Sequence, residues 1–270
     1  MPVVILCGGY GTRMGRATQD RPKPLVEIGD DPILLHIMKV YSHHGFNDFT
    51  LCLGYNGEMI KKYFIDYKVL QNDLSIGLGS KKGVEIFEEK KQENWIVNCI
   101  NTGIDTPTGG RIHRIKNFIR GKDFMVTYGD GVSNINIKDL LEYHHTRGKI
   151  ATVTAVRPPA RFGELEIEDG LVKSFSKGEQ MKSGWIDGGF FVFNKGIFEY
   201  LNDDSWLSGD VKEEKDGPNS STLQKLISDE ELVAYQHGEF WGCMDNPRDL
   251  KTLTKMWKSG KAKWDPRTNF

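Results

Sequence analysis

The sequence begins with a short apolar run that ends in a cluster of glycines, and few folds accommodate this pairing. Residues 3–7 read VVILC, and Gly8, Gly9 and Gly11 follow directly. A continuous apolar run of this length is typical of a parallel strand that is buried on both faces. The glycines predict a tight loop at the carboxyl end of that strand.

Strands and helices alternate after this loop. Helical spacing of apolar residues predicts helices, and short apolar runs predict strands. The expected elements are a helix at residues 33–41, a strand at 49–53, a helix at 56–67, a strand at 95–100, a helix at 109–119 and a strand at 124–128. This alternation predicts an α/β fold with a Rossmann-like, mostly parallel sheet flanked by helices.

The pattern changes in the second half of the chain. A helix at 138–147 and a strand at 150–156 precede three short strands at 163–167, 171–175 and 185–193. Short consecutive strands favour antiparallel pairing. We therefore expect a mixed sheet with a small antiparallel subregion.

The later sequence predicts an exposed segment and a closing helix. Residues 202–219 are acidic and rich in Ser, Gly and Asp, which is typical of an exposed loop. Pro247 is favoured at the first position of a helix, so residues 246–257 are expected to be helical. The basic and aromatic tail beyond them is expected to pack on the protein surface or on a neighbouring subunit.

Charge and composition exclude several classes of partner. Lys and Arg number 36 and Asp and Glu 37, for a net charge of -1, so no overall field attracts nucleic acid or an anionic membrane. No basic leader is present, and no apolar run approaches the roughly 18 residues that a membrane span needs. We expect a cytoplasmic protein. The four cysteines are scattered without zinc spacing, which predicts reduced thiols.

The residues around the glycine loop are suited to binding phosphate. Backbone N–H groups can approach a phosphate closely where no Cβ intervenes. Arg13 follows the loop, and Lys23 stands between Pro22 and Pro24, which restrict the backbone and present its ammonium from a rigid frame. A tight turn beside a solvated basic loop would explain the same residues without a ligand.

Asp130 lies between two glycines directly after an expected strand. Ligands of α/β sheets bind at the carboxyl ends of strands, and Mg²⁺ prefers carboxylate oxygens. A metal ligand and a plain Asp-Gly turn are the two interpretations of this motif. Asp245 precedes Asn-Pro, where an aspartate could simply cap a helix.

Ordered motifs along the chain resemble one enzyme family. GGYGTRM, RPKPLVEIG and PILLHIMKVYSHHGFNDF are followed by NTGIDTPTGGRIHR, YGDGV, GGFFVFN and FWGCMDNPRD. In this order they resemble the sugar-phosphate nucleotidyltransferases, and among these the cytidylyltransferases that act on glucose 1-phosphate. The similarity covers residues 3–264.

The resemblance implies a Mg²⁺-dependent reaction of CTP with a small phosphate ester, which gives a CDP-linked product and pyrophosphate. It implies that Arg13 and Lys23 are catalytic and that Asp130 and Asp245 hold the metal. The implied nucleotide-binding residues are Leu6, Gly8, Gly9, Gly11, Thr12, Thr108, Gly109 and Arg111. A helix N-cap is a second interpretation of Thr108. The reaction needs no protein nucleophile, so positioning and electrostatics would supply the rate.

We expect a single domain across residues 1–270 with two functional halves. Residues 1–135 would bind the nucleotide, 136–245 would bind the acceptor through the antiparallel subregion, and 246–270 would form the C-terminal helix and tail. The resemblance also implies a homo-oligomer, with residues 67–98 and the tail in its interfaces.

The acceptor side departs from the family pattern. The candidate acceptor-binding residues are Tyr128, Gly129, Lys177, Lys182, Asp187 and Gly188. The family's Glu-Lys-Pro-Lys motif, whose lysine binds the acceptor phosphate, is replaced by SKGEQMK at residues 176–182. Asp187 stands where asparagine is more usual. The acceptor is expected to be a sugar 1-phosphate such as glucose 1-phosphate or, alternatively, a non-sugar phosphate resembling phosphoglutamine or phosphocholine.

Two further classes are less consistent with the sequence. A glycosyltransferase would be expected to carry an Asp-x-Asp motif, and the DGV at residues 130–132 is not one. A non-catalytic nucleotide-binding subunit would have lost a metal carboxylate or the phosphate lysine, whereas Asp245 and Lys23 are both present. The histidine pairs at predicted helix ends are expected to be surface residues without a catalytic role: His43, His44, His144 and His145.

Overall fold

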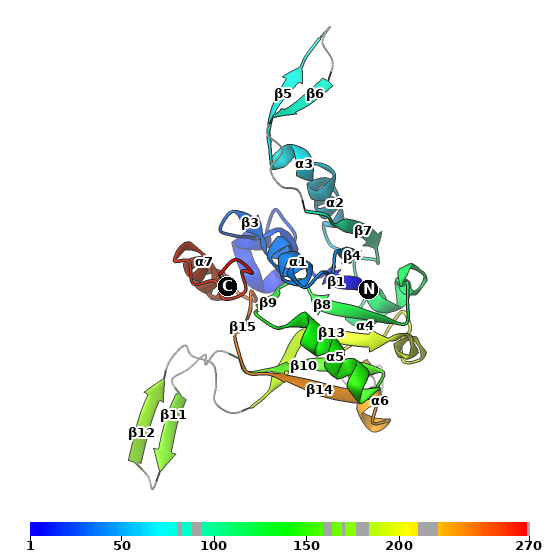
Figure 1. Cartoon of the computed structure of the whole chain (residues 1–270), viewed down its shortest axis with the longest axis vertical. Coiled ribbons are helices and arrows are strands. Elements are labelled where there is room, and N and C mark those ends of the chain that lie inside the picture. Colours follow the sequence, from blue (N-terminus) through cyan, green and yellow to red (C-terminus); the bar gives the residue numbers. More distant parts are fainter. Residues whose placement is uncertain are drawn as a thin grey trace.

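A seven-stranded sheet forms the centre of the molecule (Figure 1). The computed structural model describes residues 1–79, 83–87, 93–158, 164–168, 171–176, 184–209 and 221–268. In sheet order the strands are β14 (Leu232–His237), β10 (Ala151–Val156), β13 (Ile186–Asn194), β8 (Asp123–Tyr128), β1 (Pro2–Cys7), β4 (Asp48–Leu53) and β7 (Ile96–Asn101). Within this sheet β13 runs antiparallel to both neighbours, and the other pairings are parallel. The predicted Rossmann-like, mostly parallel mixed sheet is confirmed.

Helices pack on both faces of the sheet. They are α1 (Ile33–His43), α2 (Gly57–Ile65), α3 (Tyr67–Leu70), α4 (Thr108–Arg114), α5 (Ile137–Arg147), α6 (Thr222–Ser228) and α7 (Pro247–Lys258), with 3-10 turns η1 (Thr12–Thr18), η2 (Lys23–Leu25), η3 (Lys116–Phe118) and η4 (Lys195–Glu199). Val3 and Ile5 of β1 belong to one apolar cluster with α1, whereas Val4 and Leu6 belong to a second cluster with α4. This two-sided burial explains why the run is apolar at every position.

Four short hairpins or pairings complete the fold. They are β2 (Glu27–Ile28) with β3 (Asp31–Pro32), β5 (Asp73–Gly77) with β6 (Gly83–Phe87), β9 (Gly131–Ser133) with β15 (Trp241–Cys243), and β11 (Glu164–Glu168) with β12 (Leu171–Ser176). The hairpins β5–β6 and β11–β12 project away from the central sheet at different ends of the molecule (Figure 1). The expected antiparallel pairing of the second half is therefore present in β11 and β12.

The C-terminal tail packs on its own chain. Trp264 is buried, and its Nε1 donates to Nδ1 of His36 in α1 at 3.3 Å. The Trp257 indole fills the space beside Gly29, where a Cβ would lie 2.0 Å from Nε1. The described residues of the tail therefore pack on their own chain, and a contact of the tail with a neighbouring subunit stays a prediction.

One expectation about exposure holds in part and another is wrong. Residues 202–204, Trp206 and Gly209 of the expected exposed loop are exposed, but Ser205 and Leu207 are buried, because the backbone there is hydrogen-bonded to α4 and to the start of α6. Residues 210–219 of the same expected loop lie outside the described residues. His144 is also buried, since its Nδ1 lies 2.8 Å from Oγ1 of Thr152 in β10.

Candidate active site

The carboxyl ends of β1 and β8 open into a cavity of about 690 Å³. From β1 the chain runs to β4 and β7 on one side and later returns to β8 on the other, so the strand order reverses at β1. Open α/β sheets bind ligands at such a reversal. The cavity is lined by residues 6–13, Lys23, Pro24, residues 104–108, Arg111, residues 128–130, Trp206, Trp241, Cys243 and Asp245.

Most of the residues predicted from the sequence meet in this cavity. They are Leu6, Gly8, Gly9, Gly11, Thr12, Arg13, Lys23, Thr108, Arg111, Tyr128, Gly129, Asp130 and Asp245. Gly109, Asp187 and Gly188 do not line it, although each contacts an element that does. Lys177 and Lys182 lie outside the described residues.

Lys23 contacts both predicted metal ligands. Its Nζ donates to Asp130 Oδ2 at 2.6 Å and to Asp245 Oδ1 at 2.8 Å, and Arg13 Nη1 lies 3.2 Å from Asp245 Oδ2. Burial opposes the charged form of Lys23, but the neighbouring carboxylates outweigh it and raise the pKa of the ammonium above its ordinary value. Two cations and two anions are thus gathered at one end of the cavity.

A short antiparallel pairing brings the two carboxylates together. β9 begins directly after Asp130 and pairs with β15, which ends two residues before Asp245. The Met244 N–H also donates to the carbonyl of Asp130 at 2.9 Å. Because these contacts join segments that lie far apart in the sequence, the approach of Asp130 to Asp245 depends on the complete fold.

The cap of α7 is Asn246. Its side chain accepts the backbone N–H groups of Arg248 and Asp249, which satisfies donors at the start of the helix. The alternative interpretation of Asp245 as a simple helix cap is therefore wrong, because its carboxylate contacts Lys23 and Arg13.

The glycine loop owes its shape to one backbone conformation. Gly11 has φ 66°, a left-handed value that glycine adopts without the strain that a Cβ would add. Its carbonyl accepts the Met14 N–H at 3.0 Å and the Thr18 hydroxyl at 2.9 Å. The loop therefore turns directly into η1, while the space beside Gly9 stays open.

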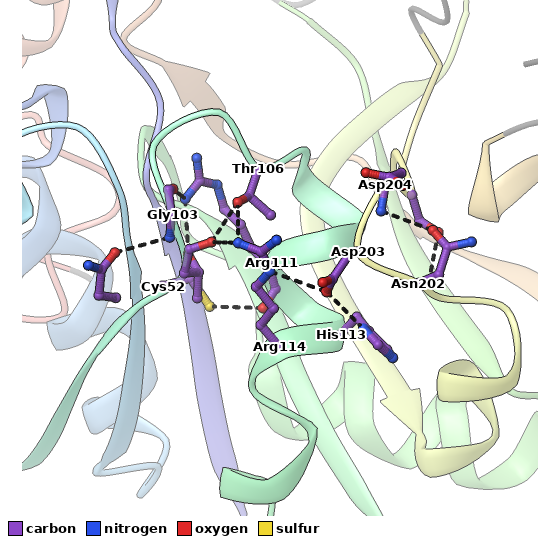
Figure 2. A network of polar contacts seen from close by, with 12 residues as sticks. Cys52, Gly103, Thr106, Arg111, His113, Arg114, Asn202, Asp203 and Asp204 are labelled. Carbon is purple, nitrogen blue, oxygen red and sulfur yellow. Dashed lines mark hydrogen bonds and ion pairs between the residues drawn. The ribbon is translucent and has the colours of Figure 1, made fainter. Parts of the chain in front are cut away.

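Arg111 fastens the glycine loop to the opposite wall of the cavity. The buried guanidinium donates to Gly8 O at 3.1 Å and Ile104 O at 2.9 Å through Nη2, and to Leu53 O, Thr102 Oγ1 and Gly103 O through Nη1. Figure 2 shows the part of this network around Gly103, Thr106 and Asp203. A Cβ on Gly8 would lie 2.1 Å from Nη1, which explains the glycine there. Arg114 extends the network to Thr106 and Asp203.

The helix that carries Arg111 is fixed by the segment at 203–207. Gly109 and Gly110 pack so closely against that segment that a Cβ would lie 2.6 Å from Ser205 O and 2.1 Å from Asp203 O. Thr108 Oγ1 accepts the Leu207 N–H at 3.0 Å and makes no cap at the start of α4. The missing side chain of Gly109 therefore allows the backbone at Ser205 to approach α4 closely.

Tyr128 connects the cavity to Asp187. Its hydroxyl lies 3.1 Å from Asp187 Oδ2 and 3.1 Å from Ser208 Oγ. Burial raises the pKa of the Asp187 carboxyl, and hydrogen bonds from the Gly189 N–H and from Tyr128 partly oppose it. Burial likewise raises the pKa of the Tyr128 phenol, so the phenol stays protonated and donates to the carboxylate.

Sequence reasoning missed several lining residues. Tyr10 lies inside the glycine loop and donates to the Asp105 carboxylate at 2.5 Å across the cavity. Trp206 belongs to a segment that was expected to be a loop, and the Trp241 Nε1 donates to Gly188 O at 2.8 Å. The one available signal was a tryptophan within an acidic, polar segment, because a large aromatic residue there needs a partner.

Known proteins share both the sequence and the fold. The profile of the family described as Nucleotidyl transferase matches residues 2–258. The chain belongs to this nucleotidyl transferase family. It is 45% identical over 264 residues to a probable glucose-1-phosphate cytidylyltransferase of Bacillus subtilis (strain 168), covering 98% of this chain and 99% of that protein.

A second relative and a solved structure complete the comparison. The chain is 40% identical over 267 residues to glucose-1-phosphate cytidylyltransferase of Salmonella typhi, covering 98% of each chain. The crystal structure of HddC from Yersinia pseudotuberculosis has the same fold, with a TM-score of 0.63 and 22% sequence identity. The superposition covers 95% of this chain and 99% of the HddC chain. The expected family is confirmed, and the chain is a nucleotidyltransferase.

No helix in the described part of the nucleotidyltransferase is both long and apolar enough to cross a bilayer. No group of three or more His, Cys, Asp or Glu side chains in the same part is arranged to hold a metal ion. A metal bound at Asp130 and Asp245 would therefore need further oxygen ligands from a substrate or from water.

Proposed function

We propose that this nucleotidyltransferase is a Mg²⁺-dependent cytidylyltransferase that joins CTP to a sugar 1-phosphate, such as glucose 1-phosphate, and releases pyrophosphate. The observation that carries the proposal is the convergence of Asp130 and Asp245 on Lys23 beside the glycine loop. The names of the relatives from Bacillus subtilis and Salmonella typhi support CTP and glucose 1-phosphate as the substrates.

The reaction follows from the charges in the cavity. A phosphate oxygen of the acceptor attacks the α-phosphorus of CTP, a new P–O bond forms, and the bond to the bridging oxygen breaks as pyrophosphate leaves with the electron pair. Because the phosphate of the acceptor is already ionised at neutral pH, its attacking oxygen needs no general base. Lys23 and Arg13 offset negative charge on the reacting oxygens, and the raised pKa of Lys23 keeps its ammonium charged at neutral pH.

Asp130 and Asp245 fit a magnesium ion. Hard carboxylate oxygens suit Mg²⁺, which usually binds through one or two carboxylates together with substrate phosphates. Both side chains are partly exposed, at 28% and 22%, so solvent and ligands can reach them. When bound, Mg²⁺ would neutralise phosphate charge.

The two walls of the cavity would divide the substrates. Residues 8–12 of the glycine loop would hold the triphosphate, and residues 104–108 on α4 and before it would face the base. Tyr128 and Gly129 would face the acceptor, with Asp187 behind them. This division assigns residues 1–135 to the nucleotide, 136–245 to the acceptor and 246–270 to the closing helix and tail of one domain.

Two properties of the whole protein belong to the same proposal. A cytoplasmic location would agree with free access to CTP and a phosphorylated acceptor. Association with copies of the same chain, as the family resemblance implies, would involve residues 67–98 and the C-terminal tail. Neither property changes the chemistry within the cavity.

A pyrophosphate-release assay tests the proposal. The protein is incubated with Mg²⁺ and CTP and, in parallel reactions, with glucose 1-phosphate, other sugar 1-phosphates, phosphocholine or phosphoglutamine. We expect turnover with a sugar 1-phosphate and a CDP-sugar product on chromatography. Turnover with phosphocholine or phosphoglutamine alone would replace the acceptor class, and pyrophosphate release that depends on another nucleotide would overturn the preference for CTP.

A further inference from the structure

Trp206 is a large aromatic side chain that faces the cavity, although its neighbours in the sequence face the core. The side chain is 42% exposed and lines the cavity, whereas Ser205 and Leu207 are buried. Exposed tryptophans with a fixed position are typical of binding surfaces, because the indole offers a wide apolar face at a small entropic cost.

The backbone around Trp206 is held on two sides. Ser205 O accepts the Gly110 N–H at 2.8 Å, and the Leu207 N–H donates to Thr108 Oγ1 at 3.0 Å. Trp206 O accepts the Thr222 N–H at 2.9 Å. Because α4 and α6 fix this short segment, the indole is presented to the cavity from a rigid frame.

The groups beside Trp206 are suited to hydroxyls. Ser208 Oγ lies 3.1 Å from the Tyr128 hydroxyl, which in turn lies 3.1 Å from Asp187 Oδ2. Since the phenol proton is directed to the carboxylate, the Ser208 hydroxyl donates to the phenol oxygen and keeps its lone pairs as acceptors. Of these groups Tyr128 lines the cavity together with Trp206, whereas Ser208 and Asp187 do not. A sugar carries both an apolar C–H face and a rim of hydroxyls, and these two features match the indole and the phenol oxygen.

We propose that Trp206 determines acceptor specificity by packing its indole against the ring of the sugar 1-phosphate. The inference rests on the proposed function and deepens it, since it predicts a pyranose or a similar ring as the acceptor body. A pyrimidine base would also stack on an indole, but the segment that carries Trp206 is joined through Ser208 to Tyr128 and Asp187, the residues proposed to face the acceptor. We therefore place the sugar against the indole.

The experiment compares Trp206→Ala, Trp206→Phe and Phe118→Ala. Phe118 is an exposed aromatic residue outside the cavity and serves as the matched control. We expect Trp206→Ala to raise KM for glucose 1-phosphate about tenfold, which corresponds to about 1.4 kcal/mol of lost binding free energy. KM for CTP and the melting temperature should stay within the range of the control, and Trp206→Phe should restore most of the affinity.

Calorimetry of product binding separates this inference from the proposed function. The ratio of the Kd values for CDP and CDP-glucose isolates the contribution of the sugar without any turnover. Trp206→Ala should bring that ratio close to one, whereas Phe118→Ala should leave it unchanged. A wild-type protein without turnover would overturn the proposed function, and an unchanged ratio in an active Trp206→Ala protein would overturn the role of the indole. A rise in KM for CTP alone would assign the indole to the base.

Discussion

Lys23 is the residue on which the electrostatics of the cavity depend. Its ammonium lies between Asp130 and Asp245, and with Arg13 it balances their charge. Removing one member leaves a partly buried charge without its partner, which would disturb both the proposed metal ligands and the proposed phosphate contacts. The chemistry should therefore be far more sensitive to these positions than the fold is.

The first prediction concerns Lys23 and Asp130. Lys23→Ala and Asp130→Asn should each lower kcat by two or more orders of magnitude, about 3 kcal/mol or more in activation free energy. Circular dichroism and the melting temperature should remain close to wild type. Asp20→Asn alters an exposed aspartate outside the cavity and provides the control. Near-normal turnover of either variant would remove that residue from the mechanism.

The second prediction concerns Asp187 and pH. Burial raises its folded-state pKa, so as pH rises the unfolded chain releases this proton first, from about pH 3.9. The ionised carboxylate then reduces the stability of the folded state at all higher pH values. Asp187→Asn removes this effect while it keeps the shape of the side chain.

The free energy of unfolding gives the measurement. In urea titrations the stability of Asp187→Asn relative to wild type should increase from about pH 4 upward and level off above the folded-state pKa. The exposed substitution Asp20→Asn should show no such trend. A relative stability that falls with rising pH would mean that the folded protein favours the charged carboxylate.

At the scale of secondary-structure elements, much of the fold could be predicted because the elements are specified by short stretches of sequence. β1 and its glycine loop are encoded within ten residues, because burial on both faces and the φ of Gly11 are local demands. Asp130 could also be predicted from the local sequence, because a Gly-Asp-Gly turn follows a buried strand. Asp245 was assigned only through the family resemblance, because its contact with Lys23 joins distant segments.

The missed and mistaken features are contacts between separate elements. Trp206 faces the cavity because of bonds to α4 and α6, which no local pattern encodes. His144 is buried because β10 supplies Thr152 as its partner. The helix C-terminus predicts a favourable site for imidazole, but it does not predict which face of the helix the strand covers.

The third prediction belongs to the C-terminal tail. Trp264 is buried against α1 through His36 and also stacks on Phe240. Trp264→Ala should lower the free energy of unfolding by about 3–5 kcal/mol, as expected when a large buried aromatic residue is removed. Urea titration measures this, and Trp185→Ala, a partly exposed tryptophan, should cost much less. Equal losses would show that the tail is not part of the core.

At the scale of the whole molecule, α2, α3, β5 and β6 form an arm that projects from the central sheet (Figure 1). Several apolar side chains along this arm are largely exposed. The fractions exposed are 88% for Leu78, 79% for Ile65 and 62% for Leu70. Apolar side chains gathered in this way are typical of a contact with another protein. The implied homo-oligomer would provide that contact.

The fourth prediction tests self-association through this arm. Sedimentation velocity of the wild-type chain should show an oligomer, and Leu78→Asp should shift it toward smaller species, because a charge cannot be buried cheaply in an apolar interface. Ile227→Asp changes an equally apolar exposed residue on α6 and should leave the oligomer intact. A wild-type protein that stays monomeric at all concentrations would contradict the oligomer.

The pairing of β9 with β15 has a consequence for protein synthesis. A growing chain leaves the ribosome from its N-terminus at about 5–20 residues per second. The glycine loop and Lys23 therefore emerge early and can fold with β4 and β8, while Asp245 follows only after β15 has emerged and paired with β9. A nascent chain can thus form its glycine loop well before Asp245 joins Lys23 and Asp130, so the complete charge cluster forms only after more than a hundred further residues have been added.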